Sequence, residues 1–378
     1  MGPESADPSP LFGLTRVLIL TASVGEGHDL PARTLAAQIR EERPDAEVIV
    51  EDGLAPMGRF VQAVSADAGR IVFYRFQWLW DVGYWFFARS SGTRAFTKFV
   101  LTRLGAPGLC GLIGRLRPDV VVSTYPNTTE VLGWLRRRER LQVPLCSAIT
   151  DLAAMEYWAG PGVDVHLITH PESAAEIRRV AGAGARIYCV HGLTAPAFRI
   201  PLEPETARRA LTLPVEGKVV LVSGGGWGVG DLTGAAEEAL RAPEVSQVVC
   251  LCGRNEQLRD RLVARFGPTP RVRVEGFTDR MAEWMAAADV LVHSTGGLTV
   301  LEALMRGLPA ISFGWGRGHV RINNAAFRRF GLAEVVSTRA DLLPAIRDAL
   351  VRGRTPVDRF EELPSAASVV LAAADRGG

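Results

Sequence analysis

A short turn near the start of the chain places a histidine among glycines and acids. It reads Ala22-Ser23-Val24-Gly25-Glu26-Gly27-His28-Asp29, after the apolar run Arg16 to Thr21 and before a helical pattern from Pro31. Because imidazole titrates near neutral pH, His28 is a candidate general base that takes a proton from an attacking hydroxyl. Gly25 and Gly27 would let a substrate approach the backbone closely. The alternative is a turn histidine that is hydrogen-bonded to the backbone.

A second turn holds five glycines within seven residues. They are Gly224, Gly225, Gly226, Gly228 and Gly230, with Trp227 among them. The turn follows the apolar run Val219 to Val222 and precedes a helix from about Leu232, so it would expose successive backbone N–H groups beside a helix N-terminus. That arrangement suits a diphosphate. The chain has neither a G-x-G-x-x-G fingerprint nor a P-loop, which argues against a nicotinamide cofactor and a P-loop nucleotide site.

A third turn runs from His293 to Glu302 and again passes from a strand through glycines into a helix. The Glu302 carboxylate lies within two helical turns of the helix start, where it would accept hydrogen bonds from two ribose hydroxyls. The alternative is a buried or capping acid.

A fourth turn, at residues 314–324, is basic. Arg317, His319 and Arg321 would face phosphate or sugar hydroxyls, and Asn323 or Asn324 would cap the next helix. A solvated basic loop is the alternative.

Aromatic side chains gather in one stretch of the first half. Residues 73–87 hold nine of them, including Trp78, Trp80 and Trp85, and arginines surround them across the segment 70–103. Aromatic rings beside cations suit an anionic membrane interface, so this segment is predicted to dock on lipid and to help bind an acceptor. A helical hairpin packed on the first domain is the alternative. A third alternative, stacking on single-stranded nucleic acid, is disfavoured because the net charge is only +2.

The elements that must position these turns alternate between strand-like and helix-like runs, which predicts an α/β fold of two doubly wound parallel sheets. The expected strands are 16–21, 46–51, 120–124, 145–150, 165–169 and 187–191, then 219–223, 247–252, 272–275, 290–294 and 310–313. Each glycine turn follows a strand. It would therefore lie at the carboxyl edge of a sheet, where open α/β sheets bind ligands.

Proline-rich sequence at residues 194–216 separates the two series of strands. The expected organisation is a flexible tail at 1–13, a first domain at 14–198, a linker at 199–216, a second domain at 217–352, and a C-terminal helix or tail at 353–378.

The composition limits the partners and the compartment. Forty-three basic residues against 41 acidic ones leave no electrostatic footprint for nucleic acid. Five cysteines without a CxxC pair give no disulfide framework, and no segment reads as a signal peptide or a membrane span. A cytoplasmic protein is expected.

Taken together, these turns resemble those of a known family. From Val17 to about Leu350 the chain resembles the two-domain glycosyltransferases that include monogalactosyldiacylglycerol synthases, processive diacylglycerol glucosyltransferases and, more distantly, the N-acetylglucosaminyltransferase that makes lipid II. The most specific matches are the glycine turn 224–230, Cys252-Gly253-Arg254-Asn255, Gly276-Phe277-Thr278 followed by Met281, and Thr295 to Pro309.

The resemblance implies the GT-B fold, with a nucleotide-sugar donor, expected to be a UDP-hexose, on the second domain and a lipid or lipid-linked acceptor such as diacylglycerol on the first. It places the base of the nucleotide near Phe277, the ribose at Glu302 and the general base at His28. The implied donor residues are Gly224, Gly225, Gly226, Trp227, Gly228, Arg254, Gly276, Phe277, Met281, Ser294, Thr295, Gly296, Gly297, Leu298, Thr299, Glu302 and His319. The implied acceptor residues are Gly25, Gly27, Tyr125, Asp151, Trp78, Trp80 and Trp85.

The chain departs from the family pattern in two turns. Ser23 stands where the plant-type loop has Asp, and Glu26 interrupts the glycine run, so Glu26 and Asp29 remain alternative bases. Gly318-His319 replaces the Gln-Glu or Gln-Gln pair with which some relatives bind the donor sugar, so the identity of the sugar stays open.

The expected reaction is an inverting single displacement at the anomeric carbon, carried out at the inner face of the plasma membrane. No metal or other cofactor is expected, since no Asp-x-Asp motif could hold a metal against the diphosphate. Three alternatives stay open: a transferase for secondary metabolites, a UDP-sugar epimerase on the same fold, and a non-catalytic nucleotide-sugar or lipid-binding protein.

Overall fold

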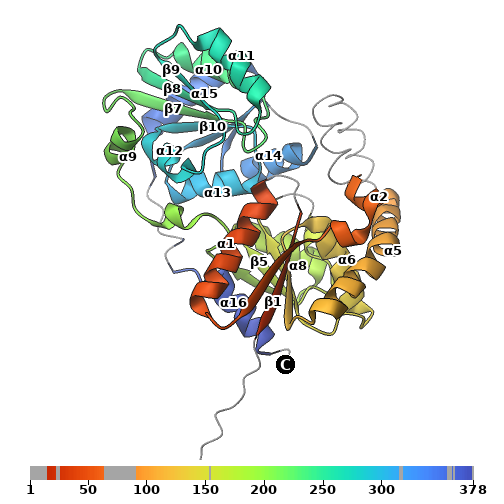
Figure 1. The fold of residues 1–378 in the computed structure, drawn as a ribbon. Helices are drawn as coiled ribbons and strands as arrows, with labels where there is room; N and C mark the ends of the chain where they lie inside the picture. Colours follow the sequence, from red (N-terminus) through yellow and green to blue (C-terminus); the bar gives the residue numbers. More distant parts are fainter. Residues whose placement is uncertain are drawn as a thin grey trace, which may run out of the picture.

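The described part of the molecule forms two α/β domains, one above the other (Figure 1). The structure is a computed structural model that describes residues 15–22, 26–63, 91–152, 155–314, 318–355, 360 and 362–376. Each domain is built on a six-stranded parallel sheet. The predicted fold class is confirmed.

The first sheet has the strand order β2-β1-β3-β4-β5-β6. Its strands are β1 (Arg16–Thr21), β2 (Glu47–Asp52), β3 (Val120–Ser123), β4 (Leu145–Ile149), β5 (Val165–Ile168) and β6 (Arg186–Cys189). Its helices are α1 (Glu26–Glu42), η1 (Ala55–Met57), α2 (Arg59–Gln62), α5 (Ser91–Leu116), α6 (Pro126–Arg137), α7 (Met155–Trp158), η4 (Pro171–Ser173) and α8 (Ala174–Ala181). Parallel strands that are covered on both faces read as unbroken apolar runs, which is why these strands were predictable.

The second sheet has the strand order β12-β11-β10-β7-β8-β9. Its strands are β7 (Lys218–Ser223), β8 (Val245–Leu251), β9 (Val272–Glu275), β10 (Val290–His293), β11 (Ala310–Phe313) and β12 (Glu334–Val336). The helices of this half of the chain are η5 (Pro196–Arg199), α9 (Pro204–Ala210), α10 (Leu232–Leu240), α11 (Glu256–Phe266), α12 (Met281–Ala287), α13 (Gly297–Met305), α14 (Gly318–Phe330), α15 (Arg339–Arg352) and α16 (Ala366–Ala374). The sequence did not predict β12, an edge strand of three residues.

Each sheet has a hydrophobic core on both faces. In the first domain, α1 and α16 pack on one face of the sheet, while η1, α5 and α6 pack on the other. In the second domain, α10, α11 and α15 cover one face, and α9, α12 and α13 cover the other. The strands are therefore held firmly, and the turns at their carboxyl ends project from rigid supports.

The chain crosses between the domains twice. After the first crossing, α9 in the expected linker packs into the core of the second domain with Phe198 and Leu211. After the second, α16 returns to lie beside α1 in the lower domain (Figure 1). Arg43 and Asp375 form an ion pair at 2.8 Å between these two helices' ends. The C-terminal helix thus belongs to the core of the first domain, which its sequence alone did not indicate.

Helix α1 begins at Glu26, not at Pro31 as predicted. Proline favours the first turn of a helix, which made Pro31 look like a start, but here it lies inside the helix. Its ring nitrogen cannot donate to the carbonyl of Gly27, four residues earlier. That carbonyl instead accepts a hydrogen bond from the Thr150 hydroxyl at 3.1 Å, which compensates for the missing donor.

Helix α5 is the one described helix that is long and apolar enough, by length and composition, to cross a membrane over Gly92–Leu116. One third of its most apolar window, 33%, is buried inside the molecule. Its buried side packs on η1 and α6. The sequence analysis did not predict a membrane-spanning helix here.

Candidate active site

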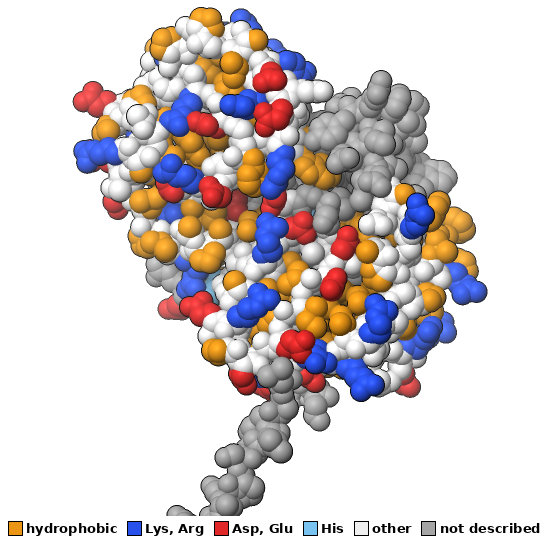
Figure 2. Space-filling view, viewed as in Figure 1, with side chains coloured by type: hydrophobic (Ala, Val, Ile, Leu, Met, Phe, Trp, Pro, Cys, Tyr) orange, Lys and Arg blue, Asp and Glu red, His pale blue; other side chains and the backbone are white. Residues whose placement is uncertain are grey.

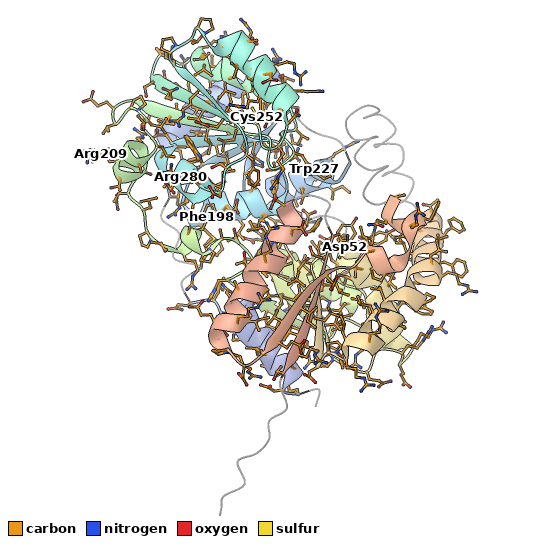
Figure 3. All side chains as sticks on the ribbon, in the orientation of Figure 1. Asp52, Phe198, Arg209, Trp227, Cys252 and Arg280 are labelled. Carbon is orange, nitrogen blue, oxygen red and sulfur yellow. The ribbon has the colours of Figure 1, made fainter. Side chains whose placement is uncertain are left out.

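A cavity of about 590 Å³ lies between the two domains and is lined by both. The first domain contributes residues from the N-terminus of α1 and from the end of β4: Glu26, Gly27, His28, Leu30, Arg33, Thr150 and Asp151. The second domain contributes the turns after β7, β8, β9 and β10, and Figure 3 shows Trp227 where the upper domain faces the lower one. The carboxyl ends of two parallel sheets therefore open onto one cavity, as expected for ligand sites in such sheets.

The His28 ring is fixed by its neighbours. Its Nδ1 lies 3.0 Å from the carbonyl oxygen of Thr124. A carbonyl can only accept, so Nδ1 carries the hydrogen and the lone pair of the neutral ring lies on Nε2. The Tyr125 ring packs edge-on against it with centroids 5.0 Å apart, and the tilted Trp158 ring packs with its centroid 5.9 Å away. His28 is thus bonded to the backbone, as the alternative interpretation held, and this bond sets the tautomer that a base requires.

The two acids near His28 are less suited to act as a base. Glu26 accepts hydrogen bonds from Arg33 at 2.7 Å and from Arg254 of the second domain at 2.6 Å. Burial acts to raise the pKa of Glu26, but these two hydrogen bonds outweigh it and the pKa is lowered. Burial raises the pKa of Asp29, whose Oδ1 accepts from the Thr21 hydroxyl at 2.8 Å, and Asp29 does not line the cavity.

The glycine turn after β7 needs its glycines for close packing. Gly228 has a φ of +59°, and a Cβ there would lie 2.0 Å from the carbonyl oxygen of Cys252. Gly230 has a φ of +99°, and its Cβ would lie 2.3 Å from the Ser294 hydroxyl. These contacts bring the turns after β7, β8 and β10 together at the cavity.

The prediction that this turn exposes successive N–H groups is wrong for four of its residues. The N–H groups of Gly224, Gly225, Gly228 and Val229 donate to the Leu251 carbonyl, the Ser223 hydroxyl and the carbonyls of Gly225 and Gly224, respectively. The N-terminus of the following helix, α10, is capped by Asp231, which accepts from Gly234 N–H at 2.8 Å and pairs with Arg339. These four N–H groups are therefore already paired within the protein.

The N-terminus of helix α13 also opens onto the cavity. Its N-cap is Gly296, which has no side chain to accept from the first N–H groups of the helix. Gly296, Gly297, Leu298 and Thr299 all line the cavity. A helix N-terminus carries a partial positive charge and unsatisfied N–H donors, which together favour an anion.

Glu302 lies in α13, lines the same cavity and is only 7% exposed. Its Oε1 accepts a hydrogen bond from the Thr194 hydroxyl at 2.7 Å. Burial raises the pKa of the carboxyl to about 7, which the bond from Thr194 partly offsets. Glu302 is therefore both a buried acid and a cavity residue, and its role toward a ribose stays a prediction.

Phe277 offers an aromatic face at the cavity. It is 49% exposed, and the Arg254 guanidinium lies over its ring at 3.7 Å. The same guanidinium forms an ion pair with Glu26 of the first domain. Arg254 therefore joins the two domains beside the predicted position of the nucleotide's base. Gly276 and Met281 also line the cavity.

The predicted fourth turn is largely helical. Asn323 and Asn324 lie inside α14, and neither caps it. The Asn323 side-chain oxygen accepts from Leu152 N–H at 3.1 Å, and that of Asn324 accepts from the Ser312 hydroxyl at 2.7 Å. Polar residues look like caps in sequence, whereas here both are buried and bind neighbouring segments.

Several predicted residues lie outside what the structure describes. They are Ser23, Gly25, Trp78, Trp80, Trp85, Arg317 and the side chain of His319. Of the remaining predicted donor, acceptor and base residues, Asp29, Tyr125 and Gly228 do not line the cavity, whereas all the others, Asp151 among them, do. Over the described ranges, no group of three or more His, Cys, Asp or Glu residues could hold a metal ion.

Sequence reasoning missed three residues of the site. Thr124 orients His28, Arg33 binds Glu26, and Thr194 binds Glu302. Thr194 and Glu302 are 108 residues apart. A single threonine between ordinary residues gives no signal of such a partner.

Two family models match consecutive parts of the chain. Residues 28–192 match the model described as monogalactosyldiacylglycerol (MGDG) synthase, and residues 219–367 match the glycosyltransferase family 28 C-terminal domain. The first matched range covers most of the first domain, and the second covers the second domain, so little of the chain is left unmatched. The chain belongs to this family of glycosyltransferases. The family predicted from the turns is confirmed.

Individual relatives agree with this assignment. A processive diacylglycerol beta-glucosyltransferase of Staphylococcus epidermidis is 23% identical over 335 residues, which cover 88% of this chain and 84% of the relative. The crystal structure of the glycosyltransferase SnogD from Streptomyces nogalater aligns with a TM-score of 0.59 at 17% identity, over 97% of this chain and 100% of that one. UGT71G1 of Medicago truncatula, complexed with UDP-glucose, aligns with a TM-score of 0.57 at 12% identity, over 96% and 94% of the two chains. At such identities the structures support the GT-B fold alone.

Proposed function

We propose that this glycosyltransferase moves a hexose from a UDP-sugar to a hydroxyl of a membrane lipid, with diacylglycerol as the first candidate. One observation carries the proposal: His28 of the first domain and the N-terminus of α13 in the second domain line one cavity. The first could activate an acceptor, and the second could hold a leaving diphosphate. The diacylglycerol acceptor is suggested by the name of the staphylococcal relative, and the UDP-sugar by the UDP-glucose in the Medicago complex.

The proposed reaction is an inverting single displacement. The acceptor oxygen bonds to the anomeric carbon while the bond from that carbon to the diphosphate oxygen breaks. The hydroxyl proton passes to His28 Nε2, and the negative charge ends on the released UDP. The N–H groups and the partial charge at the start of α13 stabilise this charge, so the protein itself supplies the electrostatic stabilisation.

The function is tested by incubating the purified protein with UDP-glucose, UDP-galactose or UDP-N-acetylglucosamine and, in separate reactions, diacylglycerol, a polyprenyl lipid or a soluble aglycone. Mass spectrometry and NMR should detect one hexosyl lipid with the opposite anomeric configuration to the donor. A donor-only reaction that yields an epimeric UDP-sugar would establish the epimerase alternative. Transfer to the soluble aglycone alone would replace the lipid acceptor with a secondary metabolite.

The first domain carries an apolar surface that suits a membrane-bound acceptor. Phe60 of α2 and Phe96 and Phe99 of α5 are 67%, 64% and 63% exposed. Arg59 and Arg103 are exposed on the same two helices. Figure 2 shows hydrophobic side chains beside Lys and Arg on the flank of the lower domain that carries α2 and α5. Aromatic side chains insert at the lipid interface while arginines bind anionic headgroups, so we propose that this flank docks on the cytoplasmic face of the membrane.

Replacing both Phe96 and Phe99 with Ser should lower the fraction of protein that sediments with anionic vesicles, by roughly tenfold in partition coefficient. The matched control replaces Val263 and Val351 of the second domain, which are also exposed, and should leave sedimentation unchanged. Equal sedimentation of the Phe96→Ser/Phe99→Ser variant and the native protein would place the membrane contact elsewhere.

A further inference from the structure

The carboxylate of Glu302 accepts a hydrogen bond from the segment that connects the two domains. Thr194 precedes η5 by two residues, at the first crossing of the chain. Its hydroxyl donates to Glu302 Oε1 at 2.7 Å, and the two side chains are 5% and 7% exposed. Among the described residues, Thr194 is the only hydrogen-bond donor to this carboxylate. A buried hydrogen bond to a carboxylate is strong and directional.

This bond determines where the rest of the carboxylate points. A carboxylate accepts through two oxygens, and Thr194 takes one position on Oε1. Among the described residues no other hydrogen bond reaches this carboxylate, and Glu302 lines the cavity, so Oε2 is the oxygen left for a ligand there. Without the hydroxyl, the long side chain of Glu302 would regain rotamers and would have no buried partner.

The connecting segment is fixed to α13 at a second point. Arg306, four residues after Glu302, donates to the carbonyl oxygens of Ala197 at 2.8 Å and Ile200 at 2.7 Å. The backbone around Thr194 is therefore anchored independently of the Thr194 hydroxyl. Removal of that hydroxyl alone should leave the segment in place.

We propose that Thr194 is a positioning residue for the donor: its hydroxyl holds the Glu302 carboxylate toward the ribose hydroxyls of the nucleotide. The segment between the domains thereby completes a site that otherwise belongs to the second domain. The proposal rests on the ribose role of Glu302 in the proposed function.

The test compares the binding of UDP and of 2′,3′-dideoxyuridine diphosphate by calorimetry, in the native protein and in Thr194→Val, Thr194→Ser and Glu302→Gln variants. Thr194→Val should weaken UDP about tenfold or more, the loss expected for a hydrogen bond to a charged group. It should weaken the dideoxy nucleotide less than about twofold, because that ligand has no ribose hydroxyls to present. Thr194→Ser keeps the hydroxyl and should restore the native preference. In transfer assays the KM for the donor should rise in Thr194→Val while kcat stays near the native value.

The outcomes separate the two levels of the proposal. If Glu302→Gln abolishes the preference for UDP but Thr194→Val keeps it, the positioning role of Thr194 is wrong while the ribose role of Glu302 stands. If Thr194→Val weakens both nucleotides equally, its role is structural only and the inference is overturned. If Glu302→Gln itself keeps the native preference, the ribose is bound elsewhere and both statements are wrong.

Discussion

Replacing His28 with Ala should lower kcat for glycosyl transfer by roughly 10²- to 10⁴-fold, the usual contribution of a general base. The affinity for UDP should stay within about twofold of the native value, since the side chain contributes to proton transfer and not to diphosphate binding. The measurement is a steady-state transfer assay together with calorimetry of UDP binding.

The controls for this variant are Glu26→Gln and Asp29→Asn. Both keep the size of the side chain and remove a carboxylate that stands near His28 in the sequence. Glu26→Gln should weaken the contact to Arg254, which also lines the cavity, and raise the donor KM severalfold, with kcat within about tenfold of native. If either control loses turnover as fully as His28→Ala is expected to, or if His28→Ala keeps native turnover, His28 is not the base.

Gly228→Ala should raise the donor KM by about 100-fold, the effect of misplacing binding groups by about 1 Å. The added Cβ would meet the carbonyl oxygen of Cys252 at 2.0 Å, and backbone on both sides leaves little room to yield. The turn that begins at Cys252 carries Arg254, which lies on Phe277. The clash would therefore displace the predicted base-binding residues, and thermal unfolding should also occur at a lower temperature.

Gly331→Ala is the matched control for this second variant. Gly331 has a φ of +65°, close to the +59° of Gly228, but no atom lies within 4 Å of its added Cβ. It should show only the backbone cost of about 1 kcal/mol and an unchanged donor KM. If both variants have the same donor KM, contact with the turn after β8 is not what requires glycine at position 228.

The strands show what local sequence can predict. The run at β1 is unbroken and apolar because helices cover both faces of the sheet, and its bounds were predicted as Arg16 to Thr21. At β12 only three residues pair, so no run of comparable length marks it. Pro31 misled the prediction of α1 because proline usually opens a helix, whereas Thr150 here satisfies the carbonyl that proline leaves without a donor.

The site shows where local sequence fails. The glycine turns and Glu302 were recognisable because strand, turn and helix follow one another within a few residues. Which N–H groups remain for a ligand depends on how the turn after β7 packs on the turn after β8, and for this reason the diphosphate is proposed to bind at α13 instead of at the turn after β7. The bonds from His28 to the Thr124 carbonyl and from Thr194 to Glu302 join distant segments, so only the folded structure reveals them.

The most direct measurement is a crystal structure of the protein with bound UDP. The diphosphate should accept hydrogen bonds from the first N–H groups of α13, from Gly297 to Thr299, with the ribose at Glu302 and His28 across the same cavity. A diphosphate bound outside this cavity, or bound within it without contact to α13, would contradict the proposed arrangement of donor and base.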